Sequence, residues 1–223
     1  MSSTTTKAIN LDALGSAEMR TAPFPWAYYT DAMRDPDGLI ASFPTEGFEF
    51  HSQRRVLETL GKRDTDAWYQ HNVATKALLE LGADKPHDAA NLDDRWLAVA
   101  DDLLSAEYRE CLSDLTGHDV RRLRMQAHFW RFGEGAWFTP HVDKPHKIVT
   151  HLMYLTDNWT AEMGGCFRVL RSDDPADVHT EIPPVPNNAI VLRRTDNAWH
   201  SVSAIPRGHD RSRRLLQVWF WDD

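Results

Sequence analysis

The spacing of apolar residues up to Gly117 is typical of helices. Three segments, 35–44, 64–82 and 92–117, place apolar side chains at roughly helical intervals. The first is expected to be a short helix that Pro44 closes, and Gly82 and Gly117 are suitable ends for the other two. The clearest stripe is that of 92–117, at Trp96, Val99, Leu103, Leu104, Tyr108, Leu112 and Leu115.

After Gly117 the apolar period changes to two residues, which predicts strands. In 120–132, one face carries Leu123, Met125, Ala127 and Phe129, and the other carries Arg122, Arg124, Gln126 and His128. We expect a strand here that is buried on one side only. Turn-rich segments separate five further expected strands, at 147–155, 166–172, 189–194, 199–205 and 213–221.

This succession of short strands favours a mainly β fold, a sandwich or a barrel, with the helices packed as a layer outside it. At 223 residues the chain is long enough for one domain with a substantial core. We expect a flexible N-terminus at 1–22 and one catalytic domain at 23–223. Within that domain, 23–117 would be the helical part and 118–223 the strand-rich core.

Composition and charge remove several functional classes. The formal net charge is -8 and no long block of like charges occurs, which disfavours nucleic acid or an anionic membrane as the main partner. No apolar run is long enough to span a bilayer, and the start "MSSTTTKAIN" lacks the apolar core of a signal peptide. Two cysteines, Cys111 and Cys166, give no disulfide framework and no CxxC motif. A cytoplasmic protein is therefore expected.

The stretch "TPHVDKP" is the first candidate for chemistry, because it places His141 and Asp143 two positions apart after a glycine-bearing turn. An HxD pair alone is common, and a buried histidine is usually a hydrogen-bonded core residue. A metal site needs a third ligand, and the candidates are His146, His151, His179, His200 and His209. Only His200 starts an apolar strand, with three expected strands between it and His141. Two histidines and one carboxylate form the facial triad of non-haem Fe(II) oxygenases.

The ordered motifs resemble those of a known family. Residues 120–222 look like the catalytic core of the 2-oxoglutarate/Fe(II)-dependent dioxygenases, in the prolyl-hydroxylase-like branch. The resemblance lies in "FGEGAWFTPHVD", "THLMYLTDNW", "GGCFRVL", "NAWHSVSAIP" and "RRLLQVWFW". The segment 23–44 also resembles the N-terminal extension of small bacterial members.

The resemblance implies a double-stranded β-helix (jelly roll) that holds Fe(II) through His141, Asp143 and His200. It also implies an arginine on the last strand that grips the distal carboxylate of 2-oxoglutarate, with a tyrosine hydroxyl, here Tyr154, on the same carboxylate. The candidate arginines are Arg211, Arg213 and Arg214. Alignment favours Arg213, which shares a strand face with Leu215, Gln217 and Trp219, although an apparent insertion at 207–210 keeps Arg211 open. Gln217 is a further candidate for contact with the co-substrate.

The implied cofactors are Fe(II), 2-oxoglutarate and O2, and the implied products of co-substrate turnover are succinate and CO2. Relatives that halogenate replace the carboxylate ligand by Gly or Ala. Asp143 therefore favours hydroxylation of a C–H bond, or a related outcome such as desaturation. Trp137, Phe138, Trp199 and Trp219 are candidates for dry walls around the site.

For the substrate, we single out Arg131, because it ends the apolar face of the strand at 120–132 and a charge there needs a partner. Weaker candidates for the pocket rim are Trp137, Lys147, Arg168 and Trp219, together with His128 and Trp130. A small polar molecule, such as an amino acid or a natural-product precursor, is the first expectation, and a protein or peptide side chain is the second. A non-catalytic metal-binding sensor and a cupin-like isomerase or hydrolase remain open.

Overall fold

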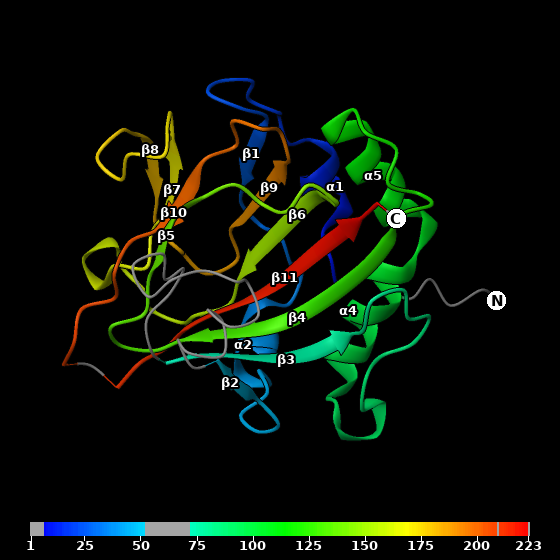
Figure 1. Ribbon diagram of the computed structural model, residues 1–223. Coiled ribbons are helices and arrows are strands. Elements are labelled where there is room, and N and C mark those ends of the chain that lie inside the picture. The colour runs from blue at the N-terminus through cyan, green and yellow to red at the C-terminus, as the bar shows by residue number, and fades with distance from the viewer. Residues whose placement is uncertain (1–6, 52–71, 209, 223) are drawn as a thin grey trace.

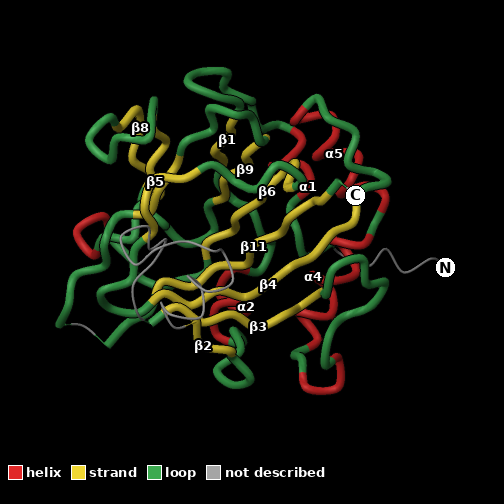
Figure 2. The backbone as a smooth tube through the Cα atoms, in the orientation of Figure 1, coloured by secondary structure: helices red, strands yellow, loops and turns green. Residues whose placement is uncertain are grey.

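The computed structural model describes residues 7–51, 72–208 and 210–222, and its framework is two antiparallel sheets (Figures 1 and 2). The seven-stranded sheet has, in spatial order, β1 (Trp26–Tyr29), β9 (Ala189–Arg193), β6 (Lys147–Tyr154), β11 (Arg213–Trp221), β4 (Arg124–Phe132), β3 (Val73–Leu79) and β2 (Glu49–His51). The four-stranded sheet has β5 (Phe138–His141), β10 (His200–Val202), β7 (Phe167–Leu170) and β8 (Val178–Ile182).

The seven-stranded sheet is covered on both faces. Helices α4 (Asp94–Leu104) and α5 (Ala106–Thr116) pack on one face, and the four-stranded sheet lies against the other (Figure 1). A hydrophobic cluster fills each interface, and strands β6, β9 and β11 contribute alternate residues to both. The expected mainly β fold, a jelly roll with helices packed outside it, is confirmed.

The strand β4 shows which face belongs to which interface. Met125, Ala127 and Phe129 are buried against the helices. The alternate residues Trp130 and Phe132 belong to the cluster between the two sheets. The apolar face that the sequence predicts is therefore buried, but against the helical layer and not in the interior of the jelly roll.

The predicted helices at 35–44 and 92–117 are present in modified form. Helix α2 spans Pro36–Ala41, where the Asp35 side chain accepts a hydrogen bond from the Gly38 amide. The longer region forms two helices, because Ser105 has an extended backbone that ends α4. The Ser105 side chain then accepts a hydrogen bond from the Tyr108 amide at the start of α5. Gly117 ends α5 in the left-handed conformation, as expected. No helix among the described residues is long and apolar enough to cross a membrane.

The helix predicted at 64–82 is wrong over the part that the structure describes. Residues 64–71 lie outside the described residues, and Val73–Leu79 forms strand β3 between β2 and β4. Hydrogen bonding to both neighbouring strands satisfies its backbone, so tertiary pairing outweighs the helical propensity of its Ala, Lys and Leu residues. A register irregularity between Ala77 and Leu79 lets both Leu78 and Leu79 be buried.

Residues 7–22, which the sequence analysis assigns to a flexible segment, pack on the helical layer instead. Helix α1 (Leu11–Gly15) contacts α5, and Ile9 and Leu14 are fully buried. The Asp102 carboxylate accepts hydrogen bonds from the backbone amides of Ala8 and Ile9, at 2.6 and 2.9 Å. This carboxylate fixes the first described residues to the end of α4.

Candidate active site

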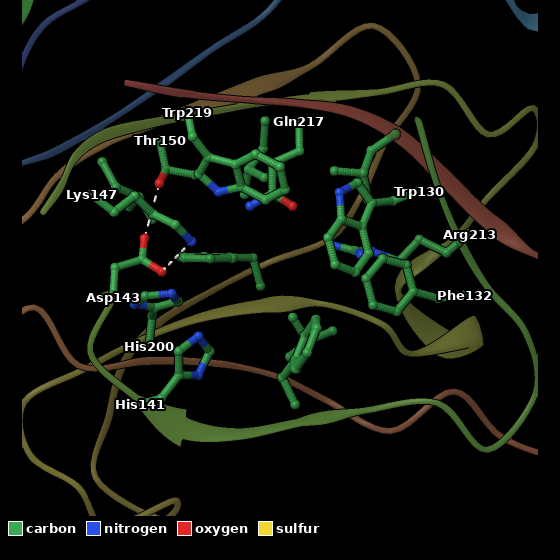
Figure 3. A pocket seen from close by; sticks show the side chains of 16 residues that line it. Trp130, Phe132, His141, Asp143, Lys147, Thr150, His200, Arg213, Gln217 and Trp219 are labelled. Carbon is green, nitrogen blue, oxygen red and sulfur yellow. Dashed lines mark hydrogen bonds and ion pairs between the residues drawn. The ribbon is translucent and has the colours of Figure 1, made fainter. Parts of the chain in front are cut away.

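The pairing of β5 with β10 brings two distant histidines together. His141 ends β5 and His200 begins β10, and the two residues are direct partners in the sheet register. Their ring centroids are 4.2 Å apart. Asp143 follows in the turn after β5, and one ligand atom from each of the three residues lies within 4.8 Å of the others (Figure 3). Of the five candidates for the third ligand, only His200 belongs to this group within the described residues; His209 lies outside them.

The backbone sets which nitrogen of each histidine can bind a metal ion. Nδ1 of His141 donates to the Thr139 carbonyl at 2.8 Å, and Nδ1 of His200 donates to the Ala198 carbonyl at 2.9 Å. A carbonyl oxygen can only accept, so the ring proton is on Nδ1 and the lone pair is on Nε2. Burial lowers the pKa of His141 to about 3 and lowers the pKa of His200. Both rings are therefore neutral, as metal ligation requires.

The carboxylate of Asp143 is held in its ionised form. Burial disfavours its charge, but the neighbouring Lys147 cation lowers its pKa below the usual range. Lys147 Nζ lies 2.8 Å from Oδ1, and Thr150 Oγ1 donates to Oδ2 at 2.9 Å. Two neutral imidazoles and one oriented carboxylate fit a divalent iron ion and leave coordination positions open on the other side.

A cavity between the two sheets opens beside these three residues (Figure 3). Its volume is about 160 Å³. Its walls are mostly apolar and aromatic. They are formed by Trp130, Phe132, Phe138, His141, Asp143, Lys147, Thr150, Leu152, Phe167, Leu192, His200, Val202, Arg213, Leu215, Gln217 and Trp219.

Arg213 lies in the cavity wall away from the three candidate ligands (Figure 3). It is 1% exposed, and its guanidinium carbon lies 4.7 Å from the centre of the Phe132 ring and 5.1 Å from that of the Tyr154 ring. Nη2 donates to Tyr154 Oη at 3.5 Å. Burial lowers the pKa of Arg213, and no carboxylate of the described residues forms an ion pair with it. The cavity thus contains a buried cation without an anion.

Arg211, the alternative candidate, precedes β11 and does not line the cavity. It is exposed, and its guanidinium donates to the backbone carbonyls of Asp157 and Asn158 at 3.3 and 3.4 Å. The alternation of β11 instead directs Arg213, Leu215, Gln217 and Trp219 into the cavity.

A glycine of the predicted "GGCFRVL" motif makes room for Arg213. Gly165 has φ of +66°, and a Cβ added there would lie 2.8 Å from Cδ of Arg213 and 3.2 Å from Cγ1 of Ile205. Both the backbone conformation and the close approach of the arginine therefore favour glycine at this position.

Comparison with known proteins gives a family match within the strand-rich part of the chain. Residues 126–221 match the family model described as the 2OG-Fe(II) oxygenase superfamily, and the matched segment contains both the histidine–aspartate cluster and Arg213. Residues 126–221 are therefore similar to a 2OG-Fe(II) oxygenase domain. Enzymes of this family use Fe(II), 2-oxoglutarate and O2, and the donor set of His141, Asp143 and His200 is suited to the iron.

Solved structures of the family share the fold. An oxidoreductase of the 2OG-Fe(II) oxygenase family from Burkholderia pseudomallei is 16% identical, over 83% of this chain and 76% of that chain, with a TM-score of 0.51. A prolyl 4-hydroxylase from Phytophthora capsici is 15% identical, over 88% of this chain and 58% of that chain, with a TM-score of 0.52. A Pseudomonas putida prolyl-4-hydroxylase is 17% identical, over 84% of this chain and 99% of that chain, with a TM-score of 0.49. No curated protein matched the sequence.

Of the predicted substrate residues, Lys147 and Trp219 line the cavity of the oxygenase domain, and Arg131 does not. Arg131 is on the helix-facing side of β4, 5.3 Å from the centre of the Phe48 ring, and donates to the Thr45 carbonyl at 3.4 Å. The structure therefore does not place Arg131 in the cavity beside the candidate metal ligands. The alternation was correct, but the face that ends at Arg131 packs on helices, whereas the cavity lies on the other face.

Trp137 and Arg168 also lie outside the cavity, contrary to expectation. Both line a separate groove that includes Pro175 and Ser203. Arg168 forms an ion pair with Glu181 on the neighbouring strand β8, which provides its charge with a partner. Neither residue is positioned to contact a molecule bound beside His141.

The sequence analysis missed Thr150, whose hydroxyl holds Asp143. Strand alternation could have predicted Thr150, because Thr150, Leu152 and Tyr154 share one face of β6 and Tyr154 was already assigned to the co-substrate. Lys147 does not follow this alternation. A register irregularity near Trp221 turns it toward the same face, and regular strand parity would have placed it outside.

Proposed function

We propose that this protein is a 2-oxoglutarate- and Fe(II)-dependent hydroxylase of a small polar substrate, such as an amino acid or a natural-product precursor. His141, Asp143 and His200 hold the iron. Arg213, with Tyr154 beside it, holds 2-oxoglutarate, and Gln217, further along the same strand, is an additional contact. The observation that carries this proposal is the unpaired, buried guanidinium of Arg213 in the cavity that also contains the histidine–aspartate cluster.

A buried cation without a partner is destabilising by several kcal/mol, so its presence at a cavity wall indicates an anionic ligand. The distal carboxylate of 2-oxoglutarate supplies that anion. A guanidinium binds a carboxylate through two parallel hydrogen bonds, and Nε of Arg213, which lacks a partner, is one of the available donors. Burial raises the pKa of Tyr154, so its hydroxyl stays protonated and can donate to the same carboxylate.

The chain's own residues prepare the reaction. When bound, iron and 2-oxoglutarate supply the oxidation: the co-substrate loses CO2, one oxygen atom of O2 enters succinate, and the other enters the substrate C–H bond. His141 and His200 offer Nε2 as the ligand atom because each Nδ1 proton is held by a carbonyl. Phe132, Phe138 and Phe167 exclude water from the cavity.

The carboxylate ligand favours hydroxylation. Asp143 occupies the position that a halide would need in a halogenating relative, and Lys147 and Thr150 together orient its two oxygens. The size of the cavity supports a small substrate, and hydroxylation of a peptide side chain is the alternative that product analysis distinguishes.

The test is succinate formation by protein loaded with Fe(II) without oxygen and then given 2-oxoglutarate and O2. Wild type should retain iron and release succinate, and His200→Ala should lose both. His179→Ala, at an exposed position of β8, is the matched control and should behave as wild type. Protein that keeps iron and binds 2-oxoglutarate but forms no succinate would instead be a binding protein.

A further inference from the structure

The buried side-chain nitrogens that lack a hydrogen-bond partner gather on one face of the seven-stranded sheet. Among the described residues, every such atom belongs to β4 or β11, which are neighbouring strands. They are His128 Nε2, Trp130 Nε1, Arg213 Nε, Trp219 Nε1 and Trp221 Nε1. All are at alternate positions that share the face of Arg213 and Trp219, toward the four-stranded sheet.

A buried donor without an acceptor costs about 1–3 kcal/mol, and native proteins contain few of them. Three of the five, on Trp130, Arg213 and Trp219, belong to residues that line the cavity, which indicates ligand atoms that accept hydrogen bonds there. The proposed 2-oxoglutarate accounts for Arg213. It leaves the indole N–H groups of Trp130 and Trp219, which also line the cavity and whose rings are 5.9 Å apart in a T-shaped contact.

A cation accompanies these indoles. Lys147 Nζ lies 4.8 Å from the centre of the Trp219 ring and 2.8 Å from Asp143 Oδ1. Figure 3 shows Lys147, Trp219 and Asp143 together at one end of the cavity, with Arg213 at the other. An ammonium has three protons, so the contact with Asp143 leaves donor capacity for a second acceptor.

The charges around the cavity point to an anion. Each histidine holds its proton on Nδ1 against a carbonyl and offers Nε2 to the metal, so it adds no charge, and Asp143 offsets one of the two lining cations, Lys147 and Arg213. Fe(II) and the dianion of 2-oxoglutarate offset each other. One positive charge therefore remains in a largely apolar cavity, where an unbalanced charge is costly.

We propose that the substrate binds as an anion, through a carboxylate held by the Lys147 ammonium and the Trp219 indole N–H, with the Trp130 indole N–H as a further donor. The proposal rests on the proposed function and specifies its substrate class. It replaces Arg131 by a donor set beside the candidate iron ligands. A carboxylate fixed at this end holds one C–H bond close to the iron, and such orientation determines which hydrogen is removed.

The test is a panel of free L-amino acids and their N-acetyl derivatives, each paired with its carboxamide. The Fe(II)-loaded enzyme receives 2-oxoglutarate and oxygen-18 gas, and mass spectrometry detects a labelled product. We expect a product hydroxylated with oxygen-18 from one or more of the compounds that bear a carboxylate, and from none of the matched carboxamides. Labelling of amides as efficiently as acids, or of no carboxylate by an enzyme that still releases succinate, would overturn the proposal.

Variants then identify the anchor. Trp219→Phe keeps the ring and removes the N–H, and we expect it to raise the KM for the carboxylate substrate about tenfold or more. The KM for 2-oxoglutarate and the affinity for Mn(II), measured by calorimetry, should stay at the wild-type values. Trp137→Phe, outside the cavity, is the matched control. An unchanged substrate KM in Trp219→Phe would exclude this donor.

Lys147→Met tests whether the ammonium of Lys147 binds the substrate. Arg131→Met, on the helix-facing side of β4 and outside the cavity, is its control. Because Lys147 also contacts Asp143, its metal affinity is measured separately, and Lys147→Arg should restore substrate affinity in part. Failure of the proposed function has a different signature. In that case wild type and every variant release no succinate, whatever compound is offered.

Discussion

At the scale of single residues, the candidate iron ligands are already in the required chemical form. Two backbone carbonyls fix the proton of His141 and His200 on Nδ1, and Lys147 and Thr150 each engage one oxygen of Asp143. Rotation of any of these three side chains would break a hydrogen bond. The neighbouring contacts therefore limit the reorganisation that metal binding requires.

Gly165 provides a residue-scale prediction about the co-substrate. Gly165→Ala introduces a methyl group 2.8 Å from Arg213 Cδ, so the arginine must shift. We expect the 2-oxoglutarate dissociation constant to rise about tenfold, because misplacing one ionic contact costs on the order of 1–2 kcal/mol. Calorimetry with the Mn(II)-loaded protein measures it.

Gly208→Ala is the matched control for that substitution. Gly208 also has positive φ, +101°, but a Cβ there meets nothing within 4 Å. It therefore reproduces the backbone strain without the contact. Equal 2-oxoglutarate affinity in the two variants would show that Gly165 does not position Arg213.

Strand position led to two predictions that place residues at the candidate site. His200 was chosen among five histidines because it starts an apolar strand, and Arg213 was chosen by its alternation with Gln217 and Trp219. Arg131, predicted from the same alternation, lies outside the cavity for a physical reason. Alternation separates the two faces of a strand, but it does not say which face meets a cavity when both are covered.

At the scale of elements, the largest error was the helix expected at 64–82. Val73–Leu79 has apolar residues at spacings that suit either a helix or an irregular strand. It forms a strand because β2 and β4 pair with it on both sides. No local pattern contains that information. The strands β1, β2, β5 and β8 were missed because they are short, and β1 and β5 also pair with segments that are distant in the chain.

Three elements meet at a buried imidazole on the helix-facing side of the sheet. His151 of β6 is fully buried, with Nε2 2.7 Å from the hydroxyl of Tyr29 in β1 and Nδ1 2.8 Å from the hydroxyl of Tyr108 in α5. Burial raises the pKa of both tyrosines and lowers the pKa of His151 to about 3. The ring is therefore neutral and joins strand to helix through two hydrogen bonds.

This arrangement predicts that acid weakens the fold. The unfolded chain takes up a proton at His151 near the ordinary pKa of 6.5, whereas the folded chain does so only near pH 3. Between these values the unfolded state binds more protons, so the free energy of unfolding falls as the pH falls. The contribution of His151 is at most about 1.4 kcal/mol per pH unit.

Urea unfolding of the metal-free protein between pH 7 and pH 4 measures this slope. His151→Gln can still hydrogen-bond but does not titrate, so its stability should fall less steeply than that of wild type. Contributions from His141, His200 and the carboxylates are present in both proteins and cancel in the comparison. Parallel curves would show that His151 contributes nothing to the acid sensitivity.

At the scale of the whole molecule, the candidate site combines residues from both sheets. His141 and His200 lie on β5 and β10 of the four-stranded sheet, and Arg213 lies on β11 of the seven-stranded sheet. The helices hold the opposite face of the larger sheet. The two-residue period of apolar positions predicted the strands, and the helical spacing before Gly117 predicted a helical layer outside them. Their order, and the cavity between them, required the folded structure.

The central claim is that Arg213 binds 2-oxoglutarate beside an iron ion held by the other sheet. The most direct measurement is calorimetric binding of 2-oxoglutarate to Mn(II)-loaded wild type, Arg213→Met and Arg211→Met. We predict that Arg213→Met raises the dissociation constant by roughly thirty-fold or more, since losing one partner of a buried charge pair costs about 2–5 kcal/mol. Mn(II) content should be equal in all three, and Arg211→Met should bind as wild type. Wild-type affinity in Arg213→Met, or weakened binding in Arg211→Met alone, would contradict the claim.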